Sequence, residues 1–126
     1  MIGYVTLGTN DFDKAAAFYD ALFGTVGVGR LMDMETFIAW GPSMEMPSVS
    51  ILLPHNGEPA TPGNGNMTAL VMDSTDKVDA MHAKALELGG ANEGDAGPRD
   101  MPGFYAGYFR DLDGNKLCVF NFTPGA

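Results

Sequence analysis

Few residues of this chain could do chemistry, and they do not form a familiar catalytic set. Cys118 is the single cysteine, and the two histidines, His55 and His82, stand apart from it in the sequence. A cysteine nucleophile needs a nearby base or cation that lowers its pKa. No Cys–His pairing is evident, so Cys118 is expected to be a buried apolar thiol. No Ser–His–Asp arrangement, phosphate-binding loop or Cys-x-x-Cys motif is present.

Two further candidates lie close together in the segment GPRDMPGFY. Arg99 could hold a carboxylate or phosphate of a ligand through two parallel hydrogen bonds, although an exposed, solvated arginine is an equal alternative. Tyr105 is a weaker candidate for the same ligand site. His82 falls beside Met81 and Ala85 on the apolar side of a predicted helix, where a partly buried structural histidine is expected.

Composition limits the classes of partner. The chain has 126 residues and a net charge of -9, which makes nucleic acid and anionic membranes poor partners. No apolar run approaches the roughly 20 residues needed to span a bilayer. The first residues lack the basic and apolar regions of a signal peptide. With a single cysteine, an intrachain disulfide framework is excluded, and a reducing cytoplasm is expected.

The first half of the sequence predicts a strand, a helix and three strands. The strand covers 2–7, and Asn10 or Asp11 caps a helix that ends at Gly24 and Gly27. Its buried stripe is Phe12, Ala15, Ala16, Tyr19, Leu22 and Phe23. Three strands are expected at 28–32, 36–40 and 49–53. A segment rich in Pro, Gly and Asn, 54–65, is the best candidate for a linker.

The second half predicts the same order of elements. A strand at 67–72 precedes a helix that Asp73 or Ser74 caps, and a weak strand is expected at 91–93. Strands at 104–110 and 116–122 follow, joined by Asp-Leu-Asp-Gly-Asn, a hairpin signal. Shifting the first half by 63 positions (70 − 7) superimposes Leu7 on Leu70. The sequence therefore predicts one domain, 1–126, built from similar modules 1–53 and 66–126.

Strand alternation predicts which side chains line a site. Tyr4 and Thr6 share one face of the first strand, as do Met67 and Ala69 in the second half. If the last hairpin pairs Arg110 with Lys116, Tyr108 lies opposite Cys118. The alternate faces, with Val5, Leu7, Leu70, Met72, Leu117 and Val119, suit packing under the helices. A pocket lined by aromatic and sulfur groups would favour an apolar or aromatic small molecule, whereas a closed core is the alternative.

Several segments resemble the glyoxalase/bleomycin-resistance/dioxygenase (vicinal oxygen chelate) superfamily. GYVTLGTNDFDKAAAFYDALF is similar to the first half of such a domain, and GNGNMTALV, STDKVDAMHAKALELGG and GFYAGYFRDLDGNKLCVF to the second. The hairpin pattern Asp-Pro-Asp-Gly-Asn is the most specific part, and Leu112 replaces its proline here. The resemblance implies an α+β fold of two tandem βαβββ modules, a curled mixed sheet forming a cup around the site, and a homodimer.

The resemblance also implies a divalent metal, whose ligand positions are substituted here. Family histidines would stand at Tyr4 and Met67, and a glutamate at Cys118. A fourth ligand would fall within 50–52, which holds Ser, Ile and Leu. Phenol and thioether groups are poor ligands for such an ion. We therefore expect no metal and no other cofactor.

Two classes of function follow, and the sequence does not choose between them. The first is a small-molecule-binding protein without metal, of the bleomycin-resistance type. The second is a lyase, isomerase or dioxygenase of the same family, which acts on an unknown small molecule. The candidate ligand pocket comprises Tyr4, Thr6, Met67, Arg99, Tyr105, Tyr108 and Cys118.

Overall fold

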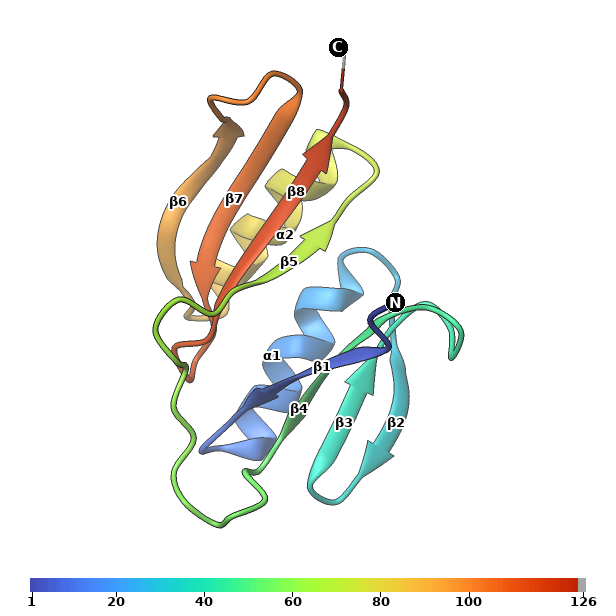
Figure 1. The fold of residues 1–126 in the computed structure, drawn as a ribbon, viewed down its shortest axis with the longest axis vertical. Helices are drawn as coiled ribbons and strands as arrows, with labels where there is room; N and C mark the ends of the chain where they lie inside the picture. Colours follow the sequence, from blue (N-terminus) through green and yellow to red (C-terminus); the bar gives the residue numbers. More distant parts are fainter. Residues whose placement is uncertain (125–126) are drawn as a thin grey trace.

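The computed structural model describes residues 1–124, and its elements follow the order βαβββ twice (Figure 1). The first module comprises β1 (Tyr4–Gly8), α1 (Phe12–Gly24), β2 (Arg30–Met34), β3 (Phe37–Trp40) and β4 (Ser48–Leu52). The second comprises β5 (Thr68–Val71), α2 (Thr75–Glu87), β6 (Ala91–Pro98), β7 (Phe104–Arg110) and β8 (Lys116–Phe122). The predicted α+β class and the tandem arrangement of modules are confirmed.

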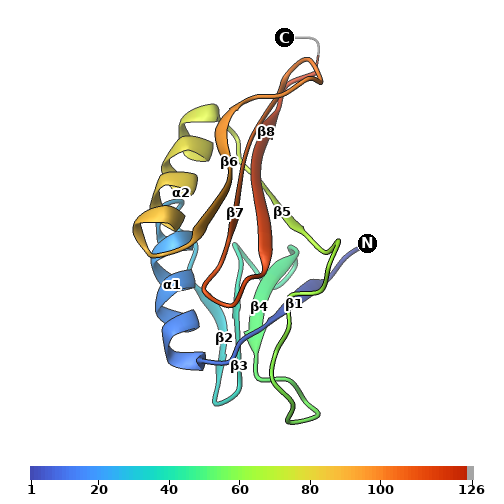
Figure 2. The same ribbon diagram turned by 90° about the vertical axis from the view of Figure 1, so that its left-hand side faces the viewer.

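Each module builds its own four-stranded sheet, and the two sheets have the same topology. The strand orders are β1-β4-β3-β2 and β5-β8-β7-β6, with one parallel pair in each sheet, β1 with β4 and β5 with β8. Leu7 pairs with Ile51 in the first sheet, as Leu70 pairs with Val119 in the second. The sheets curl without closing, and both helices lie on one side of them (Figure 2).

Helix starts follow the capping residues of the sequence. The side chain of Asp11 accepts a 3.2 Å hydrogen bond from the backbone N–H of Lys14, and Ser74 accepts one of 3.3 Å from Lys77. These contacts satisfy N–H groups that have no partner within the first turn. The sequence offers two candidate caps for each helix, and the structure uses Asp11 for α1 and Ser74 for α2.

Strand β6 is longer than the sequence predicts. The expected strand covered 91–93, whereas β6 runs over Ala91–Pro98, with sequence ANEGDAGP. Glycine, proline, asparagine and aspartate disfavour strands, so periodicity gave a weak signal. Pairing with β7 overrides this preference, and the register shifts around Gly94 and Gly97 accommodate the irregular residues.

One continuous core lies between the helices and the sheets. Tyr19 and Trp40 are each 1% exposed, and Leu117 and Val119 are fully buried. The core also includes residues of both helices and of β1, β3, β4, β7 and β8 in a single cluster. Of the strand residues predicted to pack under the helices, Leu7, Leu117 and Val119 belong to this cluster, and Leu70 and Met72 pack against it. Val5 is half-buried and lies outside the cluster. Trp40 also belongs to the core.

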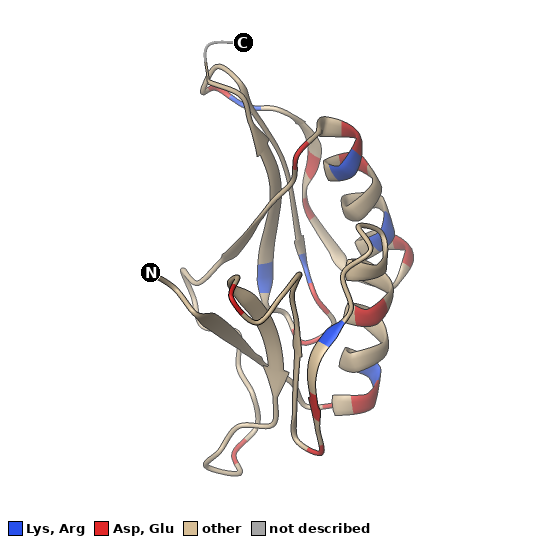
Figure 3. Cartoon of the chain, turned by 90° about the vertical axis from the view of Figure 1, so that its right-hand side faces the viewer, with Lys and Arg blue, Asp and Glu red and all other residues tan. Residues whose placement is uncertain are grey.

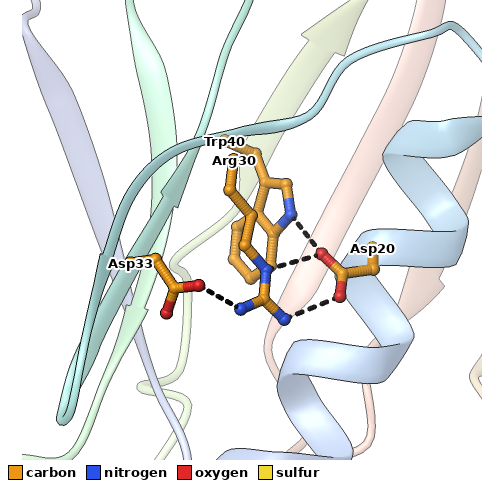
Figure 4. Close-up of polar contacts among 4 residues, drawn as sticks. All are labelled: Asp20, Arg30, Asp33 and Trp40. Carbon is orange, nitrogen blue, oxygen red and sulfur yellow. Dashed lines mark hydrogen bonds and ion pairs between the residues drawn. The ribbon is translucent and has the colours of Figure 1, made fainter.

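A polar cluster fastens the β2–β3 hairpin to α1 (Figure 4). The guanidinium of Arg30 donates to both carboxylate oxygens of Asp20, at 2.9 and 2.7 Å, and to Asp33 at 2.8 Å. The indole N–H of Trp40 donates to the same Asp20 at 2.9 Å. The hydrogen bond from Arg30 lowers the pKa of Asp20. Asp20 therefore serves both an exposed cation and a buried ring.

Charge is distributed unevenly over this architecture. Lys, Arg, Asp and Glu lie mainly on the helices and loops, while most of the strand surface carries other residues (Figure 3). Within residues 1–124, neither helix has the length and apolar character that a membrane span requires.

Candidate functional site

The strands of the second sheet place a tyrosine and the cysteine side by side on the face away from the helices. Tyr108 pairs with Cys118 between β7 and β8, as predicted from the hairpin register. The Tyr108 ring lies 5.3 Å from the guanidinium carbon of Arg99 and 5.5 Å from the ammonium of Lys116. A cation within about 6 Å of an aromatic face is attracted by the ring quadrupole. Two cations therefore contact the ring of Tyr108.

Three phenylalanines extend this surface along the same strands. We call the set Phe104, Tyr108, Phe120 and Phe122 the aromatic face. The Phe104 ring lies 5.6 Å from that of Phe120 and 6.2 Å from that of Phe122, whose side chain is 44% exposed. Packed but accessible rings offer contact area to an apolar molecule.

The thiol beside this face is poorly suited to nucleophilic chemistry. Cys118 is free and 1% exposed. Burial raises the pKa of the Cys118 thiol, and the hydrogen bond from Tyr108 and the charges of Arg99 and Lys116 offset that rise only in part. Since the thiolate is the reactive form, Cys118 stays protonated at neutral pH. This agrees with the buried thiol that the sequence predicts.

The guanidinium of Arg99 donates hydrogen bonds to backbone carbonyls of the residues just before it. One terminal nitrogen donates to the Asp95 carbonyl at 2.6 Å, and the other donates to the Gly97 and Pro98 carbonyls at 3.4 and 3.2 Å. A two-point grip on a ligand carboxylate requires these same nitrogens. In this conformation Arg99 binds the end of β6 and contacts Tyr108, and is not available as a clamp.

A pocket of about 330 Å³ opens where the two modules meet. We call it the seam pocket. It is lined by Thr6, Leu7 and Gly8 of β1, by Thr61, Pro62, Asn66 and Met67 of the connecting segment, and by Thr68, Asn115 and Lys116. Its threonines and asparagines differ in character from the aromatic and sulfur lining that the sequence suggests. The structure brings Thr6 and Met67 together here, and the aromatic side chains lie outside.

Two predicted site residues lie apart from the others. Tyr4 is 62% exposed, and its ring contacts that of Phe37 in the first sheet at 6.2 Å. Tyr105 lies on the helix side of β7, where its hydroxyl donates a 2.6 Å hydrogen bond to Asp79 of α2. That hydrogen bond raises the pKa of Tyr105. The predicted site residues thus lie in separate places. Tyr108, Cys118 and Arg99 lie together, Thr6 and Met67 line the seam pocket, and Tyr4 and Tyr105 lie apart from both.

The donor atoms at the family's ligand positions do not fit a divalent metal. Tyr4, Met67 and Cys118 offer a phenol, a thioether and a protonated thiol. Ser50 pairs with Thr6 as Cys118 pairs with Ala69, so register assigns Ser50 to the fourth position. Its hydroxyl donates to the Val5 carbonyl at 2.7 Å. None of these groups is a carboxylate or imidazole, the ligands that such ions prefer.

The histidines do not replace the missing ligands. Nε2 of His82 lies 3.1 Å from both Asn92 Oδ1 and the Tyr108 carbonyl, and the residue is 6% exposed. This is the structural role predicted for it. His55 is exposed in the segment between the modules. Within residues 1–124, no three His, Cys, Asp or Glu side chains gather where they could hold a metal.

Lys116 and Asn115 are among the residues of the site that were missed from the sequence. Lys116 lines the seam pocket and contacts the Tyr108 ring, so it links the two parts. Its position two residues before Cys118 on the same strand face was a usable signal. Asn115 is 7% exposed and forms the pocket wall, but as a turn residue it gave no sign of burial.

Comparisons with known proteins agree with this fold. The model of the "Glyoxalase/Bleomycin resistance protein/Dioxygenase superfamily" matches residues 1–119. A glyoxalase/bleomycin resistance protein from Albidiferax ferrireducens is 36% identical, with a TM-score of 0.88 and coverage of 98% of this chain and 99% of that chain. No protein with curated annotation matches.

More distant structures share the fold. A lactoylglutathione lyase from Agrobacterium tumefaciens is 20% identical, with a TM-score of 0.68 over 96% of this chain and 92% of that chain. A glyoxalase-related enzyme from Fulvimarina pelagi is also 20% identical, with a TM-score of 0.76 over 96% of this chain and 87% of that chain. The family model covers nearly the whole sequence, and the tandem βαβββ topology accompanies it. This chain belongs to the glyoxalase/bleomycin resistance protein/dioxygenase superfamily.

Proposed function

We propose that this protein binds an apolar or aromatic small molecule on the aromatic face without a divalent metal, as a binding protein of the bleomycin-resistance type. The Tyr108 ring carries the proposal. It is half-buried, lies within 5.5 Å of the cations of both Arg99 and Lys116, and is diagonal to Phe120 in the β7–β8 ladder. A planar ligand could stack on these rings at little entropic cost, since the hydrogen bonds of Arg99 to backbone carbonyls already order this side chain next to Tyr108.

The substituted ligand positions support binding without metal. A phenol, a thioether and a protonated thiol stand at Tyr4, Met67 and Cys118, and these groups hold hard or borderline ions weakly. Apolar groups there also avoid the cost of burying unpaired carboxylates. The raised pKa of Cys118 argues against an enzyme that uses this thiol as its nucleophile.

We further propose a homodimer in the reducing cytoplasm. Exposed apolar side chains on the strands and connecting segment support an interface: Tyr4 is 62%, Met67 48% and Val71 70% exposed. Burial of such exposed apolar side chains in an interface would be favourable. The free thiol of Cys118 is compatible with a reducing compartment.

The test is ligand binding in the presence of a chelator. The protein is dialysed against EDTA, its metal content is measured, and thermal unfolding is followed with bleomycin and a panel of aromatic fragments. A ligand that binds only the folded state raises the melting temperature. We expect such a rise in the wild type and a loss of it in Tyr108→Ala. Tyr105→Ala, on the same strand but the opposite face, is the matched control.

Two results would contradict the proposal. One is a stoichiometric metal that survives mild purification and is required for turnover of a substrate. The other is a panel in which no compound raises the melting temperature, or in which Tyr105→Ala and Tyr108→Ala lose binding equally. The dimer is tested separately by light scattering, where a monomeric mass at high micromolar concentration would overturn it.

A further inference from the structure

The seam pocket contains polar side chains that the fold itself does not use. Threonine side chains that form hydrogen bonds within residues 1–124 are those of Thr9, Thr25 and Thr123. The three threonines that line the pocket, Thr6, Thr61 and Thr68, are not among them. Every buried polar side-chain atom of the described residues has a partner, so these hydroxyls are open to solvent or to a ligand.

The pocket also holds a cation without a carboxylate partner. Within residues 1–124 the ion pairs involve Arg30, Lys77, Lys84 and Arg110. Lys116 has none, although acidic residues exceed basic ones by 16 to 7 in this chain. It is the single charged residue among those that line the pocket. The ammonium of this half-buried residue lies 5.5 Å from the Tyr108 ring, and the residue lines the same pocket as the three threonines. A cation that can reach hydroxyl-bearing residues favours an anion over a neutral molecule.

Hydrogen bonds outside the pocket fix its walls in place. The side-chain N–H₂ of Asn115 donates to the Gly8 carbonyl at 3.0 Å and to Asp111 Oδ2 at 2.9 Å. These bonds join the turn before β8 to β1. The connecting segment is held as well, because Asn10 exchanges hydrogen bonds of 3.1 and 2.7 Å with the backbone of Ala60. A site fixed before binding loses little entropy when a ligand enters.

We infer that the seam pocket is a binding site for a small oxyanion, a carboxylate or phosphate, which Lys116 and the hydroxyls of Thr6, Thr61 and Thr68 hold. The volume of about 330 Å³ is at the small end of the range for ligand sites. The site is separate from the aromatic face of the proposed function, with Lys116 between the two. The net charge of -9 repels anions at long range, so binding depends on these local contacts.

Amide NMR titrations test this inference with sodium phosphate, sodium acetate and the neutral isostere acetamide. We expect phosphate or acetate to cause saturable shifts at Thr6, Thr68 and Lys116, and acetamide to cause none. Lys116→Gln should weaken anion binding by at least about tenfold, which is the worth of one charged hydrogen bond. Lys116→Arg should retain binding. Lys84→Gln, which removes the same charge from α2, is the matched control.

The outcomes are decisive in either direction. Thermal unfolding establishes that each variant is folded before it is titrated. The inference is overturned if neither anion gives saturable shifts at the pocket, if acetamide binds as tightly as acetate, or if Lys84→Gln and Lys116→Gln weaken binding equally. Tyr108→Ala should leave anion shifts in place, which distinguishes this site from the aromatic face.

Discussion

The hydroxyl of Tyr19 on α1 donates a 2.5 Å hydrogen bond to Asp111 Oδ2 at the start of the last turn, so a helix of the first module is bonded to a hairpin of the second. Asp111 also accepts from the backbone N–H groups of Asp113 and Asn115, each at 2.9 Å. Tyr19 is 1% and Asp111 7% exposed. The carboxylate thus shapes its own turn and fastens it to the other module.

Removal of this hydroxyl should destabilise the protein. In Tyr19→Phe, Asp111 Oδ2 keeps the Asn115 donor but loses that of Tyr19, and the loss of a buried hydrogen bond to a carboxylate costs about 1–3 kcal/mol. Urea unfolding should show a loss of that size in the free energy of unfolding. Tyr105→Phe removes a hydroxyl from the exposed pair with Asp79 and should change stability by less than about 0.5 kcal/mol. Equal losses of unfolding free energy in the two variants would show that the hydrogen bond between the modules stabilises the protein no more than the exposed one.

Alkaline pH should act through the same tyrosine. Burial, with the nearby Asp111 charge, raises the pKa of Tyr19 well above its ordinary value. The unfolded chain therefore releases this proton first, and the contribution to stability falls as pH rises above about 10. Unfolding followed from pH 9 to 11 should be less steeply pH-dependent in Tyr19→Phe. Identical slopes in the wild type and variant would contradict this assignment.

Loss of Asp20 should cost more than loss of its neighbour Asp33. Asp20→Ala leaves the indole N–H of Trp40 without its partner, and Trp40 is 1% exposed, so a loss of about 1–3 kcal/mol is expected. Asp33→Ala removes only one arm of an exposed ion pair and should cost about 0–1 kcal/mol. Urea unfolding monitored by Trp40 fluorescence measures both. A larger loss in Asp33→Ala would exclude the indole bond as the cause.

At acidic pH, the wild type and Asp20→Ala should differ less in their free energies of unfolding. The hydrogen bond from Arg30 lowers the pKa of Asp20, so its contribution is present above the ordinary carboxyl pKa of about 4 and is lost as pH falls through the folded value. Unfolding free energies at pH 7 and pH 3 test this. A larger difference in unfolding free energy at pH 3 than at pH 7 would contradict the pH dependence that we assign to Asp20.

Cys118 should be unreactive until the protein unfolds. Burial raises its pKa, so both access and thiolate are lacking. A thiol reagent should label the native protein slowly, and urea above the unfolding midpoint should make labelling fast. A Met67→Cys, Cys118→Ala double variant places the thiol at a 48% exposed position and serves as the reactive control. Fast labelling of the native wild type would point to an activated cysteine.

Sequence periodicity predicted the elements well because most of them bury one face. β7 and β8 match their expected ranges, and Asp11 and Ser74 each belong to a pair of predicted caps. The full length of β6 was not predicted, because it is a strand through its pairing with β7 and not through its own residues. The repeat at 63 positions (70 − 7) predicted the modules, since Leu7 and Leu70 occupy matching ladder positions.

The candidate site was less predictable, because it depends on contacts between distant segments. Alternation placed Tyr108 opposite Cys118 correctly. It could not show that Arg99 bonds the end of β6, or that Tyr105 turns toward Asp79 on the helix side. The seam pocket arises where β1, the connecting segment and β8 meet, and no local pattern encodes such a meeting.

The confinement of strand pairing to single modules has a consequence for how the chain folds. No ladder between described strands joins one sheet to the other, so each sheet can form from consecutive residues alone. Such local topology favours fast folding. The first module can complete its ladder during synthesis before the second has left the ribosome. Docking of the two modules, which the hydrogen bond between Tyr19 and Asp111 joins, then follows the formation of both sheets.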